Sequence, residues 1–344
     1  MGRPRGLRDS MTEPLQQEML KAELRPSVPM SLVITVLNEA TSISTFLDSI
    51  DALTVAPMEV VVVDGGSHDG TAELVRNRSD RAPAVKLIVA PGANISRGRN
   101  LAIANATHDF VAVTDAGTAL EPDWLEKLYD GTRRGADVVS GFFRPGDGTW
   151  FEKVLGTLIL PDIREVEAES FLPSSRSVAL RKDAWRDVGG YPEWLDYCED
   201  LVFDLRLKRG GYRFEFVPEA MVAWNARPSL IAFAKQYYRY ARGDGKAGLW
   251  RKRHVARYVA YSLGVVSLIG VVVFPWGVAL TAAGFFAYLV KSYQRAFRGR
   301  RFLGRLVLPA LLLTPLIVVV GDVAKMAGYP AGLRWKWNQE STGA

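Results

Sequence analysis

Short apolar runs alternate with amphipathic segments through residues 30–250. Ile43, Phe46, Leu47 and Ile50 have the i, i+3, i+4, i+7 spacing of an amphipathic helix. Further helices are expected from near Ala72, over residues 94–106, and around Pro122 in a first helical turn. Runs typical of strands buried on both faces occupy residues 31–37, 59–64, 85–90, 110–115 and 136–143. This alternation predicts an α/β fold with a doubly wound, mostly parallel sheet.

Polar residues follow three of these predicted strands. Asn38 and Glu39 come after the first strand, Asp64 ends the second, and Asp115 ends the fourth. Each of them alone is an ordinary turn residue. Open α/β sheets bind ligands at the carboxyl ends of their strands, so together these residues predict a site at one sheet edge.

The C-terminal part of the chain has a different character. No charged residue occurs in Tyr258–Val290, a run of 33 residues, which exceeds the roughly 20 needed to cross a bilayer. Pro275 and Gly277 interrupt it, leaving two helices of about 16 residues and about 24 Å each, slightly short for a span. The apolar segments 258–274 and 276–290 therefore predict either two transmembrane helices or a re-entrant hairpin. A third segment, 306–321, is a further span or an interfacial helix, and a buried core helix is the remaining reading.

Charge and composition set further expectations. Basic residues flank the apolar run on both sides, which places both ends at the cytoplasmic face of the plasma membrane. The formal net charge is only +6 over 344 residues, and no nucleic-acid partner is expected. A single cysteine, Cys198, excludes an internal disulfide and a zinc framework. The N-terminus lacks the apolar core of a signal peptide.

The predicted organisation has three parts. Residues 1–29, bounded by Pro26 and Pro29, are expected to be a mobile tail. Residues 30–250 form the catalytic domain and residues 251–344 a membrane-associated region. A nicotinamide-binding fold is excluded, because no Gly-x-Gly-x-x-Gly motif follows the first strand.

Five motifs in order make the chain resemble the family 2 glycosyltransferases with a GT-A fold. They are VLNEA, VVVDGGSHDGT, GRNLAIANATHDFVAVTDAG, VALRKDAWRDVGGYPEWLDYCEDLVFDLRL and QYYRYARG. The resemblance covers residues 31 to about 250. It implies an inverting enzyme that transfers a sugar from a nucleotide diphosphate-sugar donor to an acceptor hydroxyl.

The resemblance also implies roles for residues near the strand ends. Asn38, Glu39 and Asp64 correspond to the edge of the pocket that binds the base and ribose. Arg99, with Arg97 beside it, would meet the diphosphate, although a solvated helix face is the simpler reading for these arginines. Gly65 lies where many relatives have a second aspartate, which weakens the expectation about the base.

The family's catalytic pair and its Gln-x-x-Arg-Trp motif have counterparts here. Glu199 and Asp200 match the Glu-Asp pair that supplies the general base, with Asp200 expected at a helix start, where an N-cap role is the alternative. Gln236 and Arg239 match the second motif, and Arg239 is expected near the diphosphate. Tyr240 replaces the usual tryptophan.

The expected metal site is incomplete. The family's Asp-x-Asp motif has Asp115 but Gly117 in its second position, and Asn225 occurs where relatives often have a histidine ligand. We expect Asp115 to contact a Mg²⁺ or Mn²⁺ ion that is otherwise held by the donor phosphates and water, or else the ribose. The acceptor is expected to be lipid-linked or a glycan. The alternatives are a non-catalytic membrane-anchored nucleotide-sugar-binding protein and a processive polysaccharide synthase.

Overall fold

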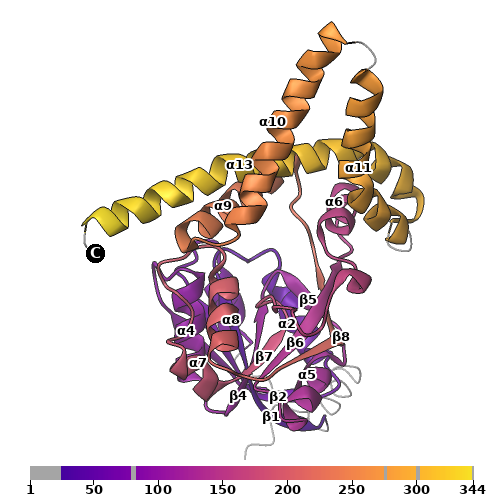
Figure 1. Ribbon diagram of the computed structural model, residues 1–344. Helices are drawn as coiled ribbons and strands as arrows, with labels where there is room; N and C mark the ends of the chain where they lie inside the picture. Colours follow the sequence, from indigo (N-terminus) through magenta and orange to yellow (C-terminus); the bar gives the residue numbers. More distant parts are fainter. Residues whose placement is uncertain (1–24, 79–82, 275–276, 300–302, 343–344) are drawn as a thin grey trace, which may run out of the picture. The chain divides into compact units, whose positions relative to one another are not determined.

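The computed structural model describes residues 25–78, 83–274, 277–299 and 303–342. Most of the predicted mobile tail lies outside these residues, and Ser27 already begins the first strand. The strands are β1 Ser27–Val36, β2 Ala56–Asp64, β3 Val85–Val89, β4 Phe110–Asp115, β5 Thr118–Leu120, β6 Val138–Pro145, β7 Val178–Arg181 and β8 Phe214–Trp224. The α-helices are α2 Ile43–Asp51, α3 Thr71–Arg76, α4 Ile95–Asn105, α5 Trp124–Arg133, α6 Trp150–Ile159, α7 Lys182–Asp187, α8 Glu199–Arg209, α9 Leu230–Ala247, α10 Arg251–Val273, α11 Gly277–Arg298 and α13 Val307–Thr342. Two 3₁₀ turns, η1 Ile163–Glu165 and η2 Gly304–Leu306, complete the described elements (Figure 1).

The strands form one sheet in the order β3-β2-β1-β4-β7-β6-β8-β5. β1 pairs in parallel with both β2 and β4, and β2 with β3. β7 runs antiparallel to both β4 and β6. The predicted α/β class with a mostly parallel sheet is therefore confirmed, with an antiparallel part around β7.

The hydrophobic pattern explains the first half of this sheet. Val33, Val61 and Val113 at the centres of their strands have no exposed surface, as expected for strands covered on both faces. The predicted residues of α2, Ile43 through Ile50, are buried at the predicted spacing. Pro122 does not lie in a helical turn; it precedes Asp123, the N-cap of α5.

The strand register brings two acidic residues to one end of the sheet. Asp64 of β2 is opposite Val36 of β1, and Asp115 of β4 is opposite Thr35. Strands in a sheet lie about 4.8 Å apart, so the backbones of the two aspartates, on either side of β1, are about 10 Å apart.

The chain divides into two compact units, each described by itself. The first contains the residues up to Phe142 together with Pro173–Gly190 and Gly210–Val222. The second contains Phe143–Leu172, Tyr191–Arg209 and Ala223–Ala344. This division does not follow the predicted boundary at residue 250, and the functions assigned to the two sequence regions stay predictions.

Helices α9 and α13 pack closely in the second unit. Gly328 and Gly332 of α13 face the carbonyl oxygens of Tyr238 and Arg242 on α9, with no room for a β-carbon at either glycine. Small residues allow two helix backbones to approach in this way. Around them, Val154, Phe233, Ala310 and Ile317 are among the residues of a buried apolar cluster.

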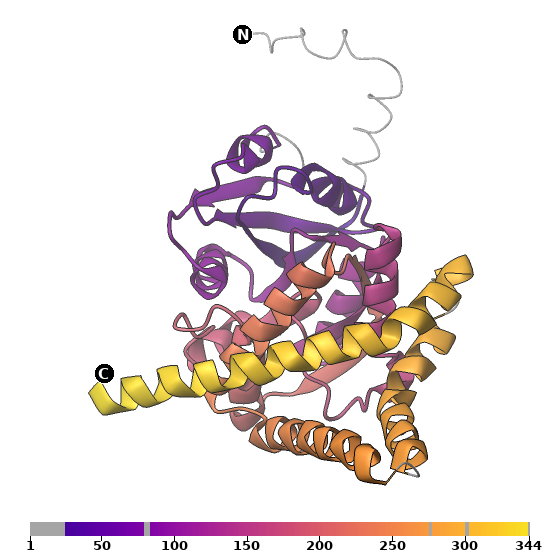
Figure 2. The same cartoon turned by 90° about the horizontal axis from the view of Figure 1, so that it is seen from above.

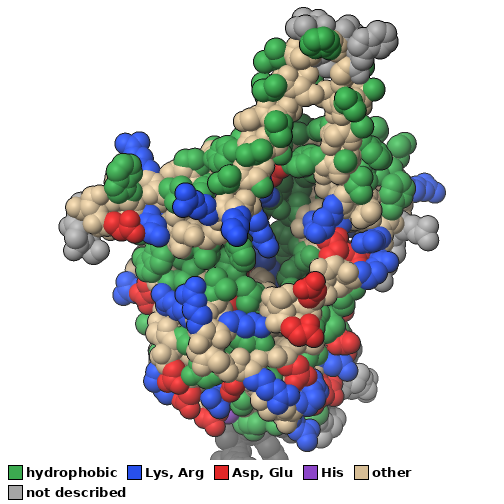
Figure 3. Space-filling model, viewed as in Figure 1, with side chains coloured by type: hydrophobic (Ala, Val, Ile, Leu, Met, Phe, Trp, Pro, Cys, Tyr) green, Lys and Arg blue, Asp and Glu red, His purple; other side chains and the backbone are tan. Residues whose placement is uncertain are grey.

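Helices α10 and α11 form a hairpin in the second unit (Figure 2), joined near their ends by a hydrogen bond between Ser267 Oγ and Thr281 Oγ1 of 2.5 Å. They have 23 and 22 residues rather than about 16, because each continues into a charged flank. Figure 3 shows hydrophobic side chains along this hairpin. The exposed large apolar residues of the hairpin include Val259, Leu263, Val265, Val266, Leu268, Ile269, Phe274, Val278, Leu280, Phe285 and Phe286.

The third apolar segment belongs to a longer helix than predicted. α13 has 36 residues and continues past Pro315 and Pro330. Among the residues with described structure, one helix, Gly304–Ser341, is by length and composition able to cross a membrane.

Candidate active site

Asp64 is the most deeply buried acidic residue at the strand ends. Its side chain has no exposed surface, and its Oδ1 accepts hydrogen bonds from the backbone N–H groups of Gly66 and Ser67, both at 2.7 Å. Its Oδ2 has no hydrogen-bond partner among the residues described. A buried oxygen of this kind is costly unless a donor reaches it. A ligand N–H or O–H would fill that position.

The loops after β1 and β2 hold each other in place. The Asn38 backbone, at φ 56°, donates to Ser67 Oγ at 2.8 Å, and Asn38 Oδ1 accepts from the His68 N–H at 3.0 Å. The Asp69 carboxylate accepts from the Ala40 N–H at 3.0 Å and from Thr71 Oγ1 at 2.5 Å. These hydrogen bonds, chiefly that of Thr71, lower the pKa of the Asp69 carboxyl. Sequence reasoning missed Asp69, although it precedes Gly-Thr in the motif that carries Asp64.

Glu39 has a local partner. Its Oε2 accepts from Ser42 Oγ at 2.5 Å, and its backbone N–H donates to Thr71 Oγ1 at 2.8 Å. The carboxylate thus supports the start of α2. The structure places Glu39 beside Asn38 at the predicted edge but gives its side chain a structural contact.

Asp115 lies between two arginines. Arg99 Nη2 donates to Asp115 Oδ1 at 2.7 Å, and Arg176 Nε is 3.8 Å from Asp115 Oδ2. Arg99 is only 3% exposed, so the solvated-face reading is wrong for it, whereas Arg97 is exposed. Arg176 was not predicted; the sequence signal would have been a basic residue two positions before β7. The two guanidinium groups make this strand end a positively charged region suited to phosphate.

The residues around Asp115 fit only one kind of metal site. In the described part of the chain, no group of three or more His, Cys, Asp or Glu side chains is close enough to hold a metal ion. Asp115 is the one carboxylate at this strand end, and its side chain is 28% exposed. Mg²⁺ is commonly bound by one or two carboxylates together with substrate phosphates. The residues therefore fit a cation that arrives with a nucleotide, and they do not fit a site made by protein alone.

The Glu199–Asp200 pair begins α8 in the second unit. Asp200 Oδ1 accepts from the Leu201 N–H at 2.8 Å, and Glu199 is only 6% exposed. The first turn of a helix favours the ionised form of a carboxylate. A base that must accept a proton is well placed there.

The residue before this pair is held in an unusual conformation. Cys198 has φ 65°, a region that L-residues other than asparagine and aspartate rarely adopt. Its thiol donates to the carbonyl oxygen of Tyr240 at 3.2 Å and to Asp244 Oδ1 at 3.4 Å. Burial raises the pKa of the Cys198 thiol well above its usual value, so the thiol remains a donor. Helix α9 thereby fixes the start of α8.

Asp244 is itself anchored on the neighbouring helices. Its Oδ2 lies 3.1 Å from His254 Nε2 on α10, and the His254 ring stacks on Tyr329 of α13 at 3.8 Å between centroids. Burial raises the pKa of the Asp244 carboxyl and lowers the pKa of the His254 imidazole. Hydrogen bonds therefore connect α9 and α10 to the segment that precedes Glu199, and ring stacking of His254 on Tyr329 adds α13.

Gln236 and Arg239 lie on α9. Gln236 is 4% exposed, and its Nε2 donates to the hydroxyl of Tyr240 at 2.8 Å. Arg239 Nη1 donates to the hydroxyl of Tyr197 at 2.8 Å. Tyr240, in the place of the expected tryptophan, thus provides a hydroxyl that bonds within the motif.

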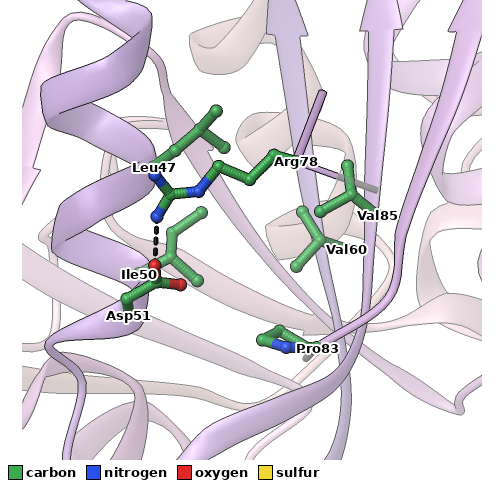
Figure 4. Close-up of a pocket in the computed structure, with 7 residues that line it drawn as sticks. All are labelled: Leu47, Ile50, Asp51, Val60, Arg78, Pro83 and Val85. Carbon is green, nitrogen blue, oxygen red and sulfur yellow. Dashed lines mark hydrogen bonds and ion pairs between the residues drawn. The ribbon is translucent and has the colours of Figure 1, made fainter. Parts of the chain in front are cut away.

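A small pocket in the first unit lies away from these residues. Figure 4 shows its lining, in which Arg78 is paired with Asp51 beside Leu47 and Ile50, and Val60 and Val85 lie on the other side of the arginine. Val60 and Val85 are register partners, four residues before the partners Asp64 and Val89. At about 3.3 Å per residue, the pocket is about 13 Å from the carboxyl ends of the strands. It is therefore not the predicted site.

Sequence comparison decides the family. The sequence profile described as Glycosyl transferase family group 2 matches residues 110–323, and that described as Glycosyl transferase family 2 matches residues 31–187. The chain belongs to the family 2 glycosyltransferases. The acidic strand ends and the Glu199–Asp200 pair are thus parts of a glycosyltransferase.

Individual relatives of this glycosyltransferase include the succinoglycan biosynthesis protein ExoA of Rhizobium meliloti, 29% identical over 62% of this chain and 68% of that protein. An undecaprenyl-phosphate 4-deoxy-4-formamido-L-arabinose transferase of Aeromonas hydrophila is 31% identical over 40% of this chain and 43% of its own. A solved mannosyltransferase from Pyrobaculum calidifontis, in complex with GDP-Man and Mn²⁺, matches with a TM-score of 0.56 and 19% identity over 94% of this chain and 95% of that one. The last similarity supports the GT-A fold.

The predicted residues of the glycosyltransferase separate into two groups. In the first unit, Asn38, Glu39 and Asp64 share one network of loops, and Asp115 is bonded to Arg99. In the second unit, Glu199 and Asp200 begin α8, while Gln236 and Arg239 lie on α9. Their roles in binding and catalysis stay predictions.

A glycine of α9 tests how tightly the start of α8 must be held. A β-carbon at Gly243 would lie 2.5 Å from the Tyr197 carbonyl oxygen and 3.0 Å from Cys198 Sγ, so Gly243→Ala must displace the segment before Glu199. We expect transfer activity to fall about 10- to 100-fold, since small misplacements of catalytic groups have costs of this size. Initial rates in detergent measure this effect.

Gly264→Ala is the matched control, because a β-carbon there has open space around it. Its activity should equal that of the wild type. If Gly243→Ala retains full activity, the packing of this segment on α9 is not required for transfer.

Proposed function

We propose that this glycosyltransferase is an inverting enzyme. It transfers a sugar from a nucleotide diphosphate-sugar to a lipid-linked or polysaccharide acceptor at the cytoplasmic face of the plasma membrane. The observation that carries this proposal is the strand-end edge of the first unit, where the buried, unpartnered Asp64 Oδ2 and the Arg99–Asp115 pair lie on either side of β1. The names of relatives, one in succinoglycan biosynthesis and one acting on undecaprenyl phosphate, support the choice of acceptors.

Each group at the strand ends has a role in binding the donor. Asp64 Oδ2 accepts a hydrogen bond from the base N–H or from a ribose hydroxyl, since an ionised carboxylate only accepts. Arg99 and Arg176 supply positive charge toward the diphosphate. Neutralising the diphosphate makes it a better leaving group.

The chemical step is a single displacement. The acceptor hydroxyl oxygen forms a bond to the anomeric carbon while the bond from that carbon to the diphosphate oxygen breaks, which inverts the configuration. Asp200, in the first turn of α8, is proposed to accept the hydroxyl proton as the general base. Glu199, which is nearly buried, is the second candidate for the base.

A processive synthase is the alternative. The Gln236–Tyr240 motif occurs in some enzymes of that kind, but a channel for a growing polymer needs several membrane helices. The described residues provide three long helices with apolar stretches, α10, α11 and α13, of which one is by length and composition able to cross a membrane, and this favours a single transfer.

Substitution of Asp200 tests the assignment of the base. Asp200→Asn keeps the size of the side chain and its hydrogen bond to the Leu201 N–H but cannot accept a proton. Transfer should fall about 100-fold or more, with nucleotide affinity nearly unchanged. Asp183→Asn, on an exposed side chain of α7, should behave as the wild type. Transfer within a few-fold of wild type in Asp200→Asn would move the assignment to Glu199.

A divalent cation is the proposed cofactor. Asp115 would be its carboxylate ligand, and when bound it adds positive charge at the donor diphosphate. Arg99 and Arg176 lie beside Asp115 and oppose binding of a cation on its own. We therefore expect Mn²⁺ or Mg²⁺ to bind weakly to the protein alone and at least about tenfold more tightly once UDP or GDP is present.

Calorimetric titration of each metal, with and without nucleotide, measures this difference. Asp115→Ala should remove the nucleotide-dependent part. Equal metal binding in both conditions, or full activity in the presence of a chelator, would show that the arginines alone neutralise the diphosphate.

The membrane location rests on the α10–α11 hairpin. Its many exposed apolar side chains, with Leu263 at 63% and Leu280 at 78% exposed, would be unfavourable in water. Arg251, Lys252 and Arg253 precede the apolar part of α10, and Lys291, Arg295 and Arg298 follow that of α11. This arrangement favours a hairpin with both ends at the cytoplasmic face.

Cysteine labelling tests this topology. Lys291 and Glu73, whose side chains are 68% and 67% exposed, are each replaced by cysteine. Both should be labelled from the same side of sealed membranes by a reagent that does not cross the bilayer. A third cysteine at Phe274 should be labelled only from the opposite side if the hairpin spans, and from neither side if it is re-entrant. Labelling of positions 291 and 73 from opposite sides would contradict the hairpin.

A further inference from the structure

A cationic stripe runs along α9 in the second unit. Arg239, Arg242 and Lys246 are spaced i, i+3 and i+7 on this helix, so their side chains share one face. Arg239 contacts an uncharged partner, the hydroxyl and ring of Tyr197. Tyr197 therefore does not neutralise the charge of Arg239, and any anion that pairs with the stripe must come from another residue.

The carboxylate of Asp196 is the anionic neighbour of both Arg242 and Lys246. Asp196 Oδ2 lies 3.4 Å from Arg242 Nη2 and 3.9 Å from Lys246 Nζ, both long for an ion pair. Asp196 is itself 50% exposed, whereas Lys246 is 12% exposed. Burial lowers the pKa of the Lys246 ammonium. Within the described part of the chain, three cations with one loosely placed anion form a surface that favours a further anion.

Aromatic rings lie beside the stripe. Trp194 and Trp335 are parallel within 4°, with centroids 5.8 Å apart, and Lys246 Nζ is 4.6 Å from the Trp335 centroid. Trp194 remains 43% exposed, and it precedes the Glu199–Asp200 pair in the same segment. An exposed tryptophan ring held rigidly by a second ring is a suitable surface for the apolar face of a sugar.

The helix that carries Trp335 also carries apolar residues typical of a membrane surface. Leu333 and Trp337 of α13 are one turn apart and are 41% and 72% exposed. Tryptophan is enriched at the boundary between lipid and water. Because Leu333 and Trp337 are both two positions from Trp335, they lie on a different face of α13, and a lipid chain attached to an anion at the α9 stripe would reach them across this helix.

We propose that Arg242, Lys246 and Trp194 form an acceptor subsite that binds the phosphate groups and first sugar of a lipid-linked glycan. This inference rests on the proposed function and names the acceptor class for it. The two cations bind the phosphate oxygens, the exposed face of Trp194 stacks on the sugar, and the lipid chain extends along the apolar surface. Arg239, which donates a hydrogen bond to the Tyr197 hydroxyl, is not part of this subsite.

Binding to the full-length protein in detergent tests the anionic part. The probes are farnesyl diphosphate, farnesol and inorganic pyrophosphate, each titrated into the wild type, Arg242→Gln and Lys246→Gln. Farnesyl diphosphate should bind the wild type, and each substitution should weaken it about 10-fold or more, as expected for a lost charged hydrogen bond. Arg209→Gln, on an exposed position at the end of α8, is the control and should bind as the wild type does.

Several results would overturn the subsite. Equal affinity for farnesyl diphosphate in the wild type and both charge variants would show that the stripe does not bind the phosphates. Pyrophosphate binding as tightly as farnesyl diphosphate, with the same loss in both variants, would show a site for a free anion. Farnesol binding that matches farnesyl diphosphate would show detergent-like binding by the apolar surface alone.

The sugar contact and the proposed function are tested separately. Trp194→Ala should raise the KM for a lipid-linked acceptor fraction from membranes about 3- to 10-fold. Trp150→Ala, at an exposed position of α6 outside the subsite, should leave it unchanged. An unchanged KM in Trp194→Ala would remove Trp194 from the subsite. Slow hydrolysis of the donor in water reports the catalytic centre and should persist in Arg242→Gln, Lys246→Gln and Trp194→Ala. No hydrolysis or transfer by the wild type would defeat the proposed function, whereas hydrolysis with unchanged acceptor kinetics in the variants would defeat only the subsite.

Discussion

The parallel pairing of β1 with both β2 and β4 is the constraint on which the first unit depends. It fixes Asp64 and Asp115 on the two strands flanking β1, within one residue of the same level. A slip of one residue in either pairing would move the side chains of that strand to the opposite face. The valine runs of these strands are buried throughout, so a slip would draw the polar residues at their ends into the covered part of the sheet, which is unfavourable. The hydrophobic core thus determines where the polar groups that are proposed to bind the donor lie.

Much of this arrangement could be predicted because its signals are local. Continuous β-rich runs identified β1 to β4, and helical spacing identified the buried face of α2. The four residues of β7 are too short a run to show a pattern, and their antiparallel pairing depends on contacts distant in sequence. The same limit applies to the site. Asp115 was visible at a strand end, but its partner Arg176, 61 positions later, follows only from the fold.

The second unit shows how a strained residue can be kept in place. Cys198 adopts a left-handed conformation directly before Glu199, and such conformations persist only where surrounding contacts determine them. Here the contacts come from α9, through the Tyr240 carbonyl and Asp244, and Asp244 is held in turn by His254 on α10. Helices α9 and α10 therefore support the residues proposed for proton transfer. Sequence spacing gave no sign of this connection, since the residues share no motif.

Hydrogen–deuterium exchange with and without UDP or GDP tests most directly the claim that the carboxyl ends of the parallel strands bind the donor nucleotide. Exchange is measured over the whole chain at a saturating nucleotide concentration with Mn²⁺ present. The account predicts slower exchange in residues 37–42, 64–71 and 115–118, which follow β1, β2 and β4. Unchanged exchange in these three loops, together with slower exchange around the pocket lined by Arg78 and Val85, would contradict it.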